Sequence, residues 1–336
     1  MKLITVVIPN YNCQDYLDRC IESIVSQTYV DLEILICDNG SEDDSVSVIN
    51  KWAQKDARIK VLINEKNQGL VNCYNRLFFA ATGEYIVIMD ADDWSDVTRV
   101  EKQAAVLDEH HVGICISNAV FHKHFGAPQF TPHGGSRLIN KNSDEVWASA
   151  PATMMFRRDA LQQVKGYNTY FHMLSAYDVY FVMSMLDAYG GYYLDEPLYH
   201  VWARPLSDHR SLDVNEPNFL RKAISGDIYR FLRKQRIETG TDWLKENNMT
   251  EVKKLENEKL NDKSYMSEKL RAIACIQIDY GSYKNAWLLL LEAFKKAPFY
   301  LENYRSLLYL LKSKYSNKKN YKELTKDKIA PQRVNV

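Results

Sequence analysis

The chain has 336 residues, of which 46% are apolar, and its 43 basic and 43 acidic side chains give a formal net charge of zero. This composition excludes a chain that is disordered throughout, and the length suits about two domains. Residues 1–209 carry 17 basic and 27 acidic side chains, whereas residues 210–336 carry 26 basic and 16 acidic ones. An acidic front half argues against a general nucleic-acid binder. We predict an acidic catalytic or metal-binding body in residues 1–210 and a basic, mainly helical region in residues 211–336.

No apolar run reaches the ~18 to 20 residues that span a bilayer. The first residues lead directly into a strand-like run, without the apolar segment and cleavage site of a secretory leader. We therefore expect a cytoplasmic protein. The six cysteines agree with this, because none lies in a CxxC pair or shows zinc-ligand spacing, which predicts reduced thiols.

Strand and helix patterns alternate along the first part of the chain. Continuous apolar runs predict strands at residues 3–8, 32–37, 59–63 and 85–89. Helical periodicity separates these runs, at residues 15–27, 45–54 and 70–81. This alternation predicts an α/β fold, with a mostly parallel sheet and helices on both of its faces.

Three of the predicted strands end in polar clusters, at residues 9–12, 38–41 and 90–93. Ligands in such sheets bind beyond the carboxyl ends of the strands. We therefore expect these clusters to meet at one edge of the sheet and to form a binding site there.

Residues 90–93 read Asp-Ala-Asp-Asp directly after a buried strand. Three carboxylates so close together repel one another, and a divalent cation such as Mn²⁺ or Mg²⁺ relieves that repulsion. The alternative is a solvated acidic turn that caps the next helix. The strand before the motif and the two other polar clusters favour the metal site.

Residues 118–150 are rich in His, Gly and Pro, and we expect a long loop or an irregular hairpin there. After residue 210 the spacing becomes helical. Between residues 281 and 298 the sequence matches the second half of a tetratricopeptide unit, through Gly281, Tyr283, Ala286, Ala293 and Pro298. This match predicts a tetratricopeptide-like helix pair at residues 268–312. We expect the Lys- and Asn-rich tail after Tyr315 to be frayed.

Long, ordered motifs carry a resemblance to a known family. They are VVIPNYN (6–12), DLEILICDNGSEDDS (31–45), NQGLVNCYN (67–75) and ATGEYIVIMDADDW (81–94), followed by MMFRRDAL (154–161) and GYNTYFHMLSAYDVYFVMSML (166–186). Together they resemble the family 2 glycosyltransferases of the GT-A fold, of the type that builds bacterial surface glycans. The resemblance covers residues 1–210 and implies nothing for the remainder.

The resemblance implies a UDP-sugar site at the strand ends. Pro9, Tyr11 and Asn12 match the segment that borders uracil and ribose, and Asp38 matches the aspartate that hydrogen-bonds uracil. Asn39 stands where the family usually has a second aspartate.

Further along the chain, the resemblance places Gly69 and Asn75 near the nucleotide, while Tyr74 replaces a common arginine. Asp90 and Asp92 match the DxD motif. The resemblance implies that Asp92 coordinates the metal. It also implies that Asp90, with Ala91, lies near the ribose or a metal-bound water. Asp93 would orient these residues or cap a helix.

The family's general base is the aspartate of an acidic pair that opens a helix, and here that pair reads Tyr177-Asp178. The resemblance therefore implies that Asp178 deprotonates the acceptor hydroxyl in an in-line, inverting displacement. The alternative is a helix-opening aspartate favoured by the macrodipole.

Arg157 and Arg158 match the acceptor side, as does Tyr177, although ordinary surface arginines remain the alternative. Arg204 aligns with a family histidine that can reach the metal. His200 and His209 lie close to it in sequence, so this ligand stays unassigned.

These residues predict a metal-dependent, inverting glycosyltransferase that moves a hexose or N-acetylhexosamine from a UDP-sugar to a glycan or lipid-linked acceptor. A dehydrogenase is disfavoured because no GxGxxG follows the first strand. The remaining alternative is a non-catalytic interaction protein that acts through its helical C-terminal region. We expect residues 211–336 to contact an anionic membrane on its inner face or a protein partner, or else to form a solvated helical extension.

Overall fold

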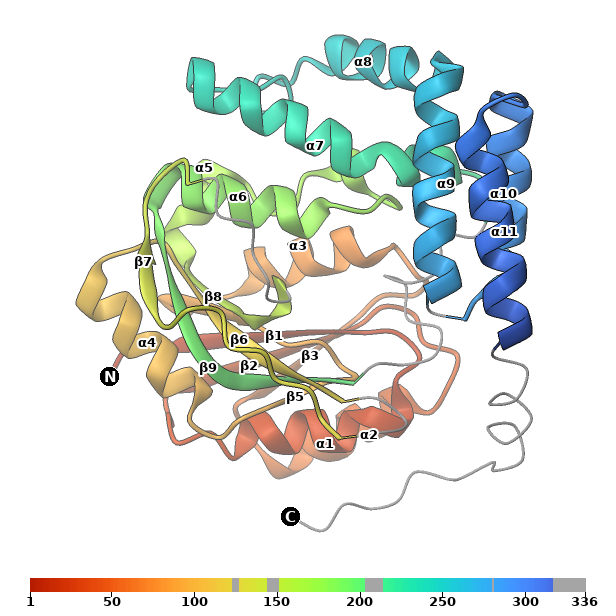
Figure 1. Ribbon diagram of the computed structural model, residues 1–336. Coiled ribbons are helices and arrows are strands. Elements are labelled where there is room, and N and C mark those ends of the chain that lie inside the picture. The colour runs from red at the N-terminus through yellow and green to blue at the C-terminus, as the bar shows by residue number, and fades with distance from the viewer. Residues whose placement is uncertain (123–126, 144–150, 203–213, 280, 317–336) are drawn as a thin grey trace. The chain divides into compact units, whose positions relative to one another are not determined.

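The computed structural model describes residues 1–122, 127–143, 151–202, 214–279 and 281–316 (Figure 1). The chain divides into two compact units. Unit 1 consists of residues 1–205 and 229–248, and unit 2 consists of residues 206–228 and 249–336. The boundary that we expected at residues 210 and 211 lies outside the described residues. Residues 229–248, which we expected in the C-terminal region, belong to unit 1.

Unit 1 is built on a nine-stranded sheet in the order β3-β2-β1-β4-β8-β6-β9-β5, with β7 paired to β9. Its strands are β1 (Ile4–Asn10), β2 (Leu32–Asp38), β3 (Ile59–Ile63), β4 (Tyr85–Ile88), β5 (Trp94–Ser95), β6 (Ile114–His122), β7 (Arg137–Ile139), β8 (Met154–Arg157) and β9 (Gly191–Trp202). The first four strands of that order are parallel, as are β6 and β9, whereas β8, β5 and β7 pair antiparallel to their neighbours. The expected α/β fold is confirmed, and its sheet is mixed.

Helices cover both faces of this sheet (Figure 1). One face packs against α1 (Gln14–Val25), α2 (Ser45–Lys55) and α4 (Arg99–His110). The other packs against α3 (Leu70–Ala80), α5 (Leu161–Val164) and α6 (Tyr177–Tyr189). Successive side chains of a strand point to opposite faces, so Val6 enters the first core and Val7 the second. This is why the central strands read as unbroken apolar runs.

The strand order creates a switch point at the carboxyl ends of β1 and β4. Helices α1 and α2 carry the chain outward from β1 to β2 and β3, and α3 then returns it to β4 on the other side of β1. Loops that leave β1 and β4 therefore diverge, and the space between them is where ligands bind in such sheets.

Residues 118–150 were expected to form a long loop or an irregular hairpin, and an antiparallel bridge between Phe121 and Gln129 agrees with the hairpin. Two segments of this region are regular strand instead. Residues 118–122 continue β6 and pair with β9, and β7 forms within the same region. The register shifts on both sides of Asn118, where its amide donates to the Thr131 carbonyl and to Asp195, each at 2.8 Å. The sequence did not reveal this strand because the bulge at Asn118 interrupts the regular alternation of side chains along β6.

Unit 2 is helical, as expected. Its helices are α8 (Met249–Asn261), α9 (Lys263–Asp279), α10 (Tyr283–Lys296) and α11 (Leu301–Ser316), while α7 (Phe219–Thr239) is shared between the two units. Ala286 and Ala293 are fully buried, and the Ser267 hydroxyl of α9 donates to the Ala293 carbonyl at 2.9 Å. These small residues let α9 and α10 approach closely. Residues 268–312, for which a tetratricopeptide-like helix pair was predicted, include parts of three helices, α9, α10 and α11. No helix among the described residues is long and apolar enough to cross a membrane.

The C-terminal half of α7 is tied into unit 1 by a buried ionic cluster. Arg236 donates to the Asp187 carboxylate of α6 at 2.8 and 2.9 Å and also to Asp242. The Tyr180 hydroxyl lies 3.0 Å from both Asp242 oxygens. Asp242 is fully buried and Arg236 is 4% exposed, so each charge depends on the other for compensation.

Replacing Arg236 by methionine keeps the length of the side chain but removes the ion-pair partner of the buried Asp242. Asp187 loses one of two cations, because Arg233 also lies 3.3 Å from its carboxylate. We expect a loss of about 3–5 kcal/mol in the free energy of unfolding of unit 1, measured by urea denaturation. The matched control is Lys234→Met, since the Lys234 side chain is 76% exposed and pairs only with Glu238 in the same helix. An Arg236→Met loss no larger than that of the control would contradict this role.

Candidate active site

The loop after β2 is fixed around Asp38, which is 1% exposed. Its Oδ1 accepts from the Asn10 amide at 2.7 Å and the Ser41 hydroxyl at 2.6 Å, and its Oδ2 accepts from the backbone N–H groups of Gly40 at 3.2 Å and Ser41 at 3.0 Å. The carboxylate therefore joins the ends of β1 and β2. Asn10, which sequence reasoning left without a role, is the β1 partner in this arrangement.

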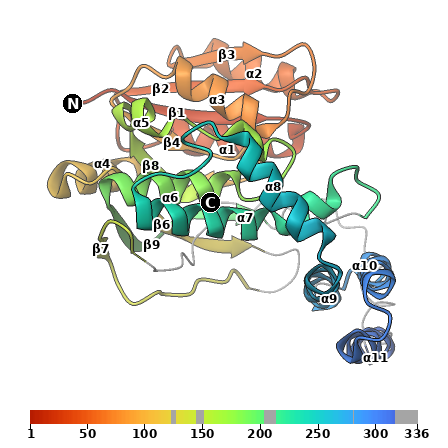
Figure 2. The same cartoon turned by 90° about the horizontal axis from the view of Figure 1, so that it is seen from above.

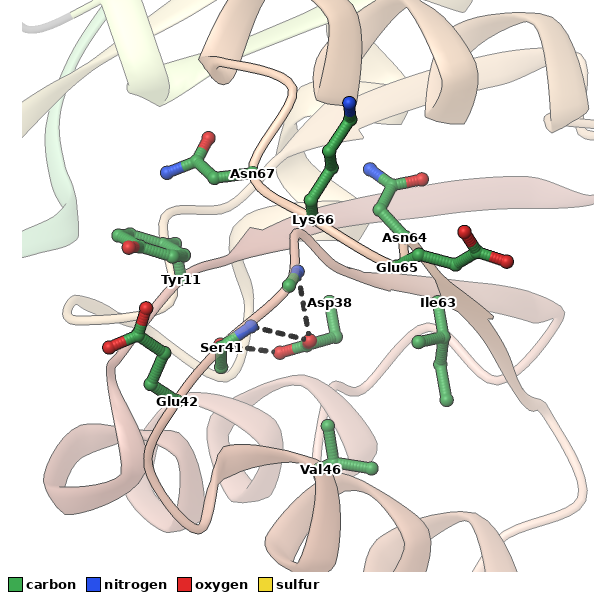
Figure 3. A pocket seen from close by; sticks show the side chains of 11 residues that line it. Tyr11, Asp38, Ser41, Glu42, Val46, Ile63, Asn64, Glu65, Lys66 and Asn67 are labelled. Carbon is green, nitrogen blue, oxygen red and sulfur yellow. Dashed lines mark hydrogen bonds between the residues drawn. The ribbon is translucent and has the colours of Figure 1, made fainter.

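A pocket of about 410 Å³ opens beside this loop (Figure 3). It is lined by side chains from the ends of β1, β2 and β3 and from α2, namely Tyr11, Asp38, Gly40, Ser41, Glu42, Val46, Ile63, Asn64, Glu65, Lys66 and Asn67. Tyr11 is 40% exposed, and its ring stands across the pocket from Ile63 (Figure 3). The arrangement offers a flat aromatic face next to a polar floor.

Two residues hold the pocket's loops against each other. Gly40 has a φ of +77°, and a Cβ there would lie 2.6 Å from the Lys66 carbonyl carbon, so only glycine permits this approach. The buried Asn39 amide donates to Asn67 at 3.0 Å, and its carbonyl accepts from Asn64 at 2.8 Å. Asn39 thus bridges two loops. Asn12 acts similarly, because its carbonyl accepts from the Glu42 N–H at 2.8 Å.

The acidic motif lies at the carboxyl end of β4, on the other side of β1 from β2. Asp92 is half-buried, whereas Asp93 and Ala91 are buried. Burial raises the pKa of the Asp93 carboxyl well above its ordinary value, and the negative charges of Asp92 and Asp90 raise it further. Asp93 accepts from the Trp202 N–H at 2.7 Å, which joins the motif to β9. Three carboxyl groups thus lie within four positions at the end of β4.

Two arginines that sequence reasoning missed supply positive charge around the motif. Arg99 of α4 is fully buried and donates to the carbonyl of Ile88, the last residue of β4, at 3.0 Å. Burial lowers the Arg99 pKa to about 10, which still leaves it protonated at neutral pH. Arg19 of α1 donates to the Asp92 carbonyl at 3.1 Å and lies 3.8 Å from the centre of the Trp94 ring. Both sit on amphipathic helices, where periodicity gives an arginine no distinguishing signal.

Tyrosine rings connect Asp90 to Asp178, which lies 88 positions later. The Tyr74 hydroxyl donates to Asp90 Oδ1 at 2.5 Å. Tyr167 packs edge-on against both Tyr74 and Tyr177, with ring centres 5.1 Å apart in each case. Burial raises the pKa of Tyr167, and charge at Tyr177, Asp178 and Asp90 raises it further. Both carboxylates therefore lie near one phenol group, as expected for a shared site.

Asp178 lies in the first turn of α6 and is half-buried. Its carboxylate accepts from the Val179 N–H at 2.7 Å. The residue before the helix, Ala176, has a φ of +71°, so the chain turns sharply to begin α6 here. The side chain is thus held at the N-terminus of α6.

Several other predicted site residues have structural partners. Asn75 makes a double hydrogen bond with the backbone of Tyr167, at 2.8 and 2.7 Å, so its amide positions the tyrosine. Pro9 is buried within β1 opposite Cys37. Gly69 has a φ of +79°, and a Cβ there would overlap the His172 ring at 2.4 Å. These three residues shape the site without facing the pocket.

The placement of Arg157 and Arg158 on the acceptor side is wrong. Arg157 pairs with Tyr85 at the amino end of β4, because β8 runs antiparallel to β4. Its guanidinium donates to the Val112 carbonyl at 2.9 Å, and that of Arg158 donates to the Gly83 carbonyl at 2.7 Å. Both arginines therefore lie at the amino end of β4, at the opposite end of the strand from the acidic motif.

His200 lies on β9 and stacks parallel to Trp94, with ring centres 5.0 Å apart. Its Nδ1 lies 3.0 Å from His122 Nε2. Burial lowers the pKa of His200, and it lowers that of His122 to about 4, so both rings are neutral at pH 7. Arg204 and His209 lie outside the described residues. Within the described part of the chain, no group of three His, Cys, Asp or Glu side chains is arranged to hold a metal.

Parts of the chain match known proteins and a known family. The family model described as glycosyl transferase family 2 matches residues 5–165, which include the Asp38 loop and the acidic motif but end before Asp178. EpsE of Bacillus subtilis, described as a glycosyltransferase, is 30% identical over 205 residues, which are 59% of this chain and 72% of EpsE. WfaP of Escherichia coli, named as a UDP-Glc:α-D-GlcNAc-diphosphoundecaprenol β-1,3-glucosyltransferase, is 36% identical over 125 residues, 37% of this chain. That match spans 49% of WfaP, about half its length.

Among solved structures, residues 1–349 of Staphylococcus aureus TarS in complex with UDP-GlcNAc superpose with a TM-score of 0.59. The superposition covers 90% of this chain and 89% of that one, at 20% sequence identity. It shows a shared fold, so the expected GT-A architecture is confirmed. Together with the relation to EpsE and the sequence motifs, it shows that the chain belongs to glycosyl transferase family 2 and is a glycosyltransferase.

Proposed function

We propose that this enzyme transfers a hexose or N-acetylhexosamine from a UDP-sugar to a hydroxyl of a growing surface polysaccharide or oligosaccharide, with a divalent cation and with inversion. The observation that carries the proposal is the arrangement at the switch point: a polar pocket with an aromatic wall at the ends of β1 and β2, and the Asp90–Asp92 turn at the end of β4. WfaP is named for UDP-Glc, and TarS was solved with UDP-GlcNAc, which supports a UDP-linked donor.

The base of the donor fits the pocket beside Tyr11, whose exposed ring can stack on a flat heterocycle. Both oxygens of Asp38 already accept two hydrogen bonds each from Asn10, Gly40 and Ser41. A uracil N3–H that bonds Asp38 directly must therefore displace one of these donors. Otherwise Asp38 acts by holding the loop that shapes the pocket.

The acidic motif fits Mn²⁺ or Mg²⁺. Asp90, Asp92 and Asp93 place three carboxyl groups within four positions, and a cation would offset their mutual repulsion. Asp92, with Asp90 beside it, would hold the ion. Because hard cations keep water and substrate phosphates as ligands, two protein carboxylates are enough. The bound cation would stabilise the charge that develops on the departing UDP.

Asp178 is the proposed general base. Its carboxylate takes the proton from the acceptor hydroxyl while that oxygen forms a bond to the sugar's C1 and the bond from C1 to the diphosphate oxygen breaks. The electron pair leaves with UDP. Because the acceptor oxygen attacks from the face opposite UDP in this same step, the anomeric centre inverts.

The acceptor is a glycan or a lipid-linked saccharide, and we place the reaction at the cytoplasmic side of the membrane. The acceptor in the name of WfaP is a diphosphoundecaprenol lipid, which supports this assignment. A lipid-linked acceptor would bring the enzyme to the membrane surface during each turnover.

The metal assignment predicts linkage between UDP and cation. UDP should raise the melting temperature more with Mn²⁺ than with a chelator, because only the cation joins the diphosphate to Asp92. Asp92→Asn should abolish the difference, whereas Asp108→Asn, which alters a carboxylate bound to Lys2, should retain it. Equal UDP stabilisation in chelator would contradict the assignment.

Removing the base should affect turnover and leave donor binding intact. We expect Asp178→Asn to lower sugar transfer roughly 10²- to 10⁴-fold, because the amide cannot accept the proton. UDP affinity, measured by calorimetry, should change only a few-fold. Asp159→Asn alters an exposed carboxylate nearby in sequence and serves as the control. Normal turnover of Asp178→Asn would show that another group accepts the proton of the acceptor hydroxyl.

The Tyr74 hydroxyl should matter through Asp90. Tyr74→Phe removes the donor to a charged carboxylate, and such hydrogen bonds contribute ~1.5–3 kcal/mol, so UDP–Mn²⁺ affinity should fall about 10-fold or more. Tyr85→Phe is the matched control, because the Tyr85 hydroxyl donates to Asp108 at the opposite edge of the sheet. Equal effects of the two variants in calorimetric titrations would show that Tyr74 contributes to stability alone.

A further inference from the structure

Exposed apolar side chains are concentrated on the last three helices of unit 2. Ten of the 23 large apolar side chains that are exposed among the described residues lie between residues 276 and 311. Phe299 is 90% exposed, Leu301 73% and Leu308 66%. Scattered exposed apolar residues are ordinary, but a contiguous group marks a surface that contacts another molecule.

These side chains form one continuous surface on α10 and α11. Trp287, Leu291 and Phe294 follow helical spacing along one stripe of α10. On α11 the matching stripe consists of Leu301, Tyr304, Leu308 and Leu311. The Phe294 and Tyr304 rings meet with their centres 4.9 Å apart, and the Tyr283 hydroxyl at the start of α10 donates to the Ser313 carbonyl near the end of α11 at 3.4 Å.

The two helices therefore run antiparallel and side by side, as Figures 1 and 2 show. Their stripes join across the Phe294–Tyr304 contact. Phe299 lies in the turn between the helices, so it extends the same surface at one end. We call this group of side chains the α10–α11 surface.

Basic side chains outnumber acidic ones on α10 and α11. Residues 283–316 contain six basic and only two acidic side chains. Both acids are already paired within their own helices, Glu292 with Lys295 at 2.5 Å and Glu302 with Arg305. With six basic and two acidic side chains, residues 283–316 carry a net positive charge, to which Lys284, Lys296 and Lys314 contribute.

We propose that the α10–α11 surface docks on an anionic lipid surface. Apolar and aromatic side chains enter the interfacial region of a bilayer while flanking lysines contact anionic headgroups, which is the composition of membrane-surface helices. A second copy of the chain is a poorer occupant, because a two-fold interface would bring the same basic helices together. The inference concerns where the enzyme works and does not depend on the identity of the donor.

The test uses the full-length protein and sedimentation with vesicles. The protein should pellet with vesicles of phosphatidylcholine and phosphatidylglycerol at low salt, and much less with phosphatidylcholine alone or at high salt. The triple variant Phe299→Ser, Leu301→Ser and Leu308→Ser should reduce the pelleted fraction at least tenfold. Lys284→Glu, at an exposed position of α10, should weaken binding at least roughly fivefold, the effect of one basic residue near an anionic surface.

The matched control is the double variant Phe79→Ser and Leu138→Ser, which removes two exposed apolar side chains from unit 1 and should pellet like the parent protein. UDP-induced stabilisation is measured for every variant, so that misfolding is distinguished from lost docking. Pelleting that the triple variant leaves unchanged would overturn the assignment to this surface. A concentration-dependent dimer in light scattering that the triple variant abolishes, without vesicle binding by the parent, would assign the surface to a second copy and overturn the lipid proposal.

Discussion

The arrangement of unit 1 depends on negative charge at the end of one buried strand. Asp90, Asp92 and Asp93 follow β4 within four positions, and the chain brings donors to them from several elements. Arg99 of α4 holds the last carbonyl of β4 from beneath, Arg19 of α1 holds the Asp92 carbonyl, and Tyr74 of α3 donates to Asp90. The N–H of Trp202 fixes Asp93 to β9. Two of these four donors bind backbone carbonyls and two bind carboxylates. Under the proposed function, a divalent cation would supply the further positive charge.

Tyr74 and Tyr177 stand at two positions where the sequence departs from the family pattern, and the structure connects them. Each replaces a charged residue, and both pack edge-on against Tyr167. Asn75 holds Tyr167 in place through its backbone. The rings of Tyr74, Tyr167 and Tyr177 thus form a row that extends from Asp90 toward Asp178 without adding charge. Because no cation stands at Tyr74, we expect the diphosphate charge to be balanced chiefly by the metal.

Periodicity predicted the first four strands and the helices between them, because buried strands and amphipathic helices leave local patterns in the sequence. The strand-end clusters predicted a binding site beyond the carboxyl ends of those strands. Motif positions also predicted the pocket-lining Asp38 and the turn at Asp90 and Asp92. Arg99 and Arg19 could not be predicted, since the significance of a helical arginine comes from what lies beneath it in the fold. Arg157 and Arg158 were misplaced because the sequence does not reveal that β8 runs antiparallel to β4, which moves both residues to the opposite edge. The α10–α11 surface was invisible for a similar reason: apolar residues in a helical pattern predict burial, and only the packing shows which of them stay exposed.

A crystal structure of the complex with UDP and Mn²⁺ tests the central claim most directly, since manganese is located by its anomalous scattering. The account predicts the ion in coordination distance of an Asp92 carboxylate oxygen and of both phosphates, with uracil beside Tyr11 in the pocket at the ends of β1 and β2. Manganese bound away from residues 90–93, or uracil outside that pocket, would contradict it.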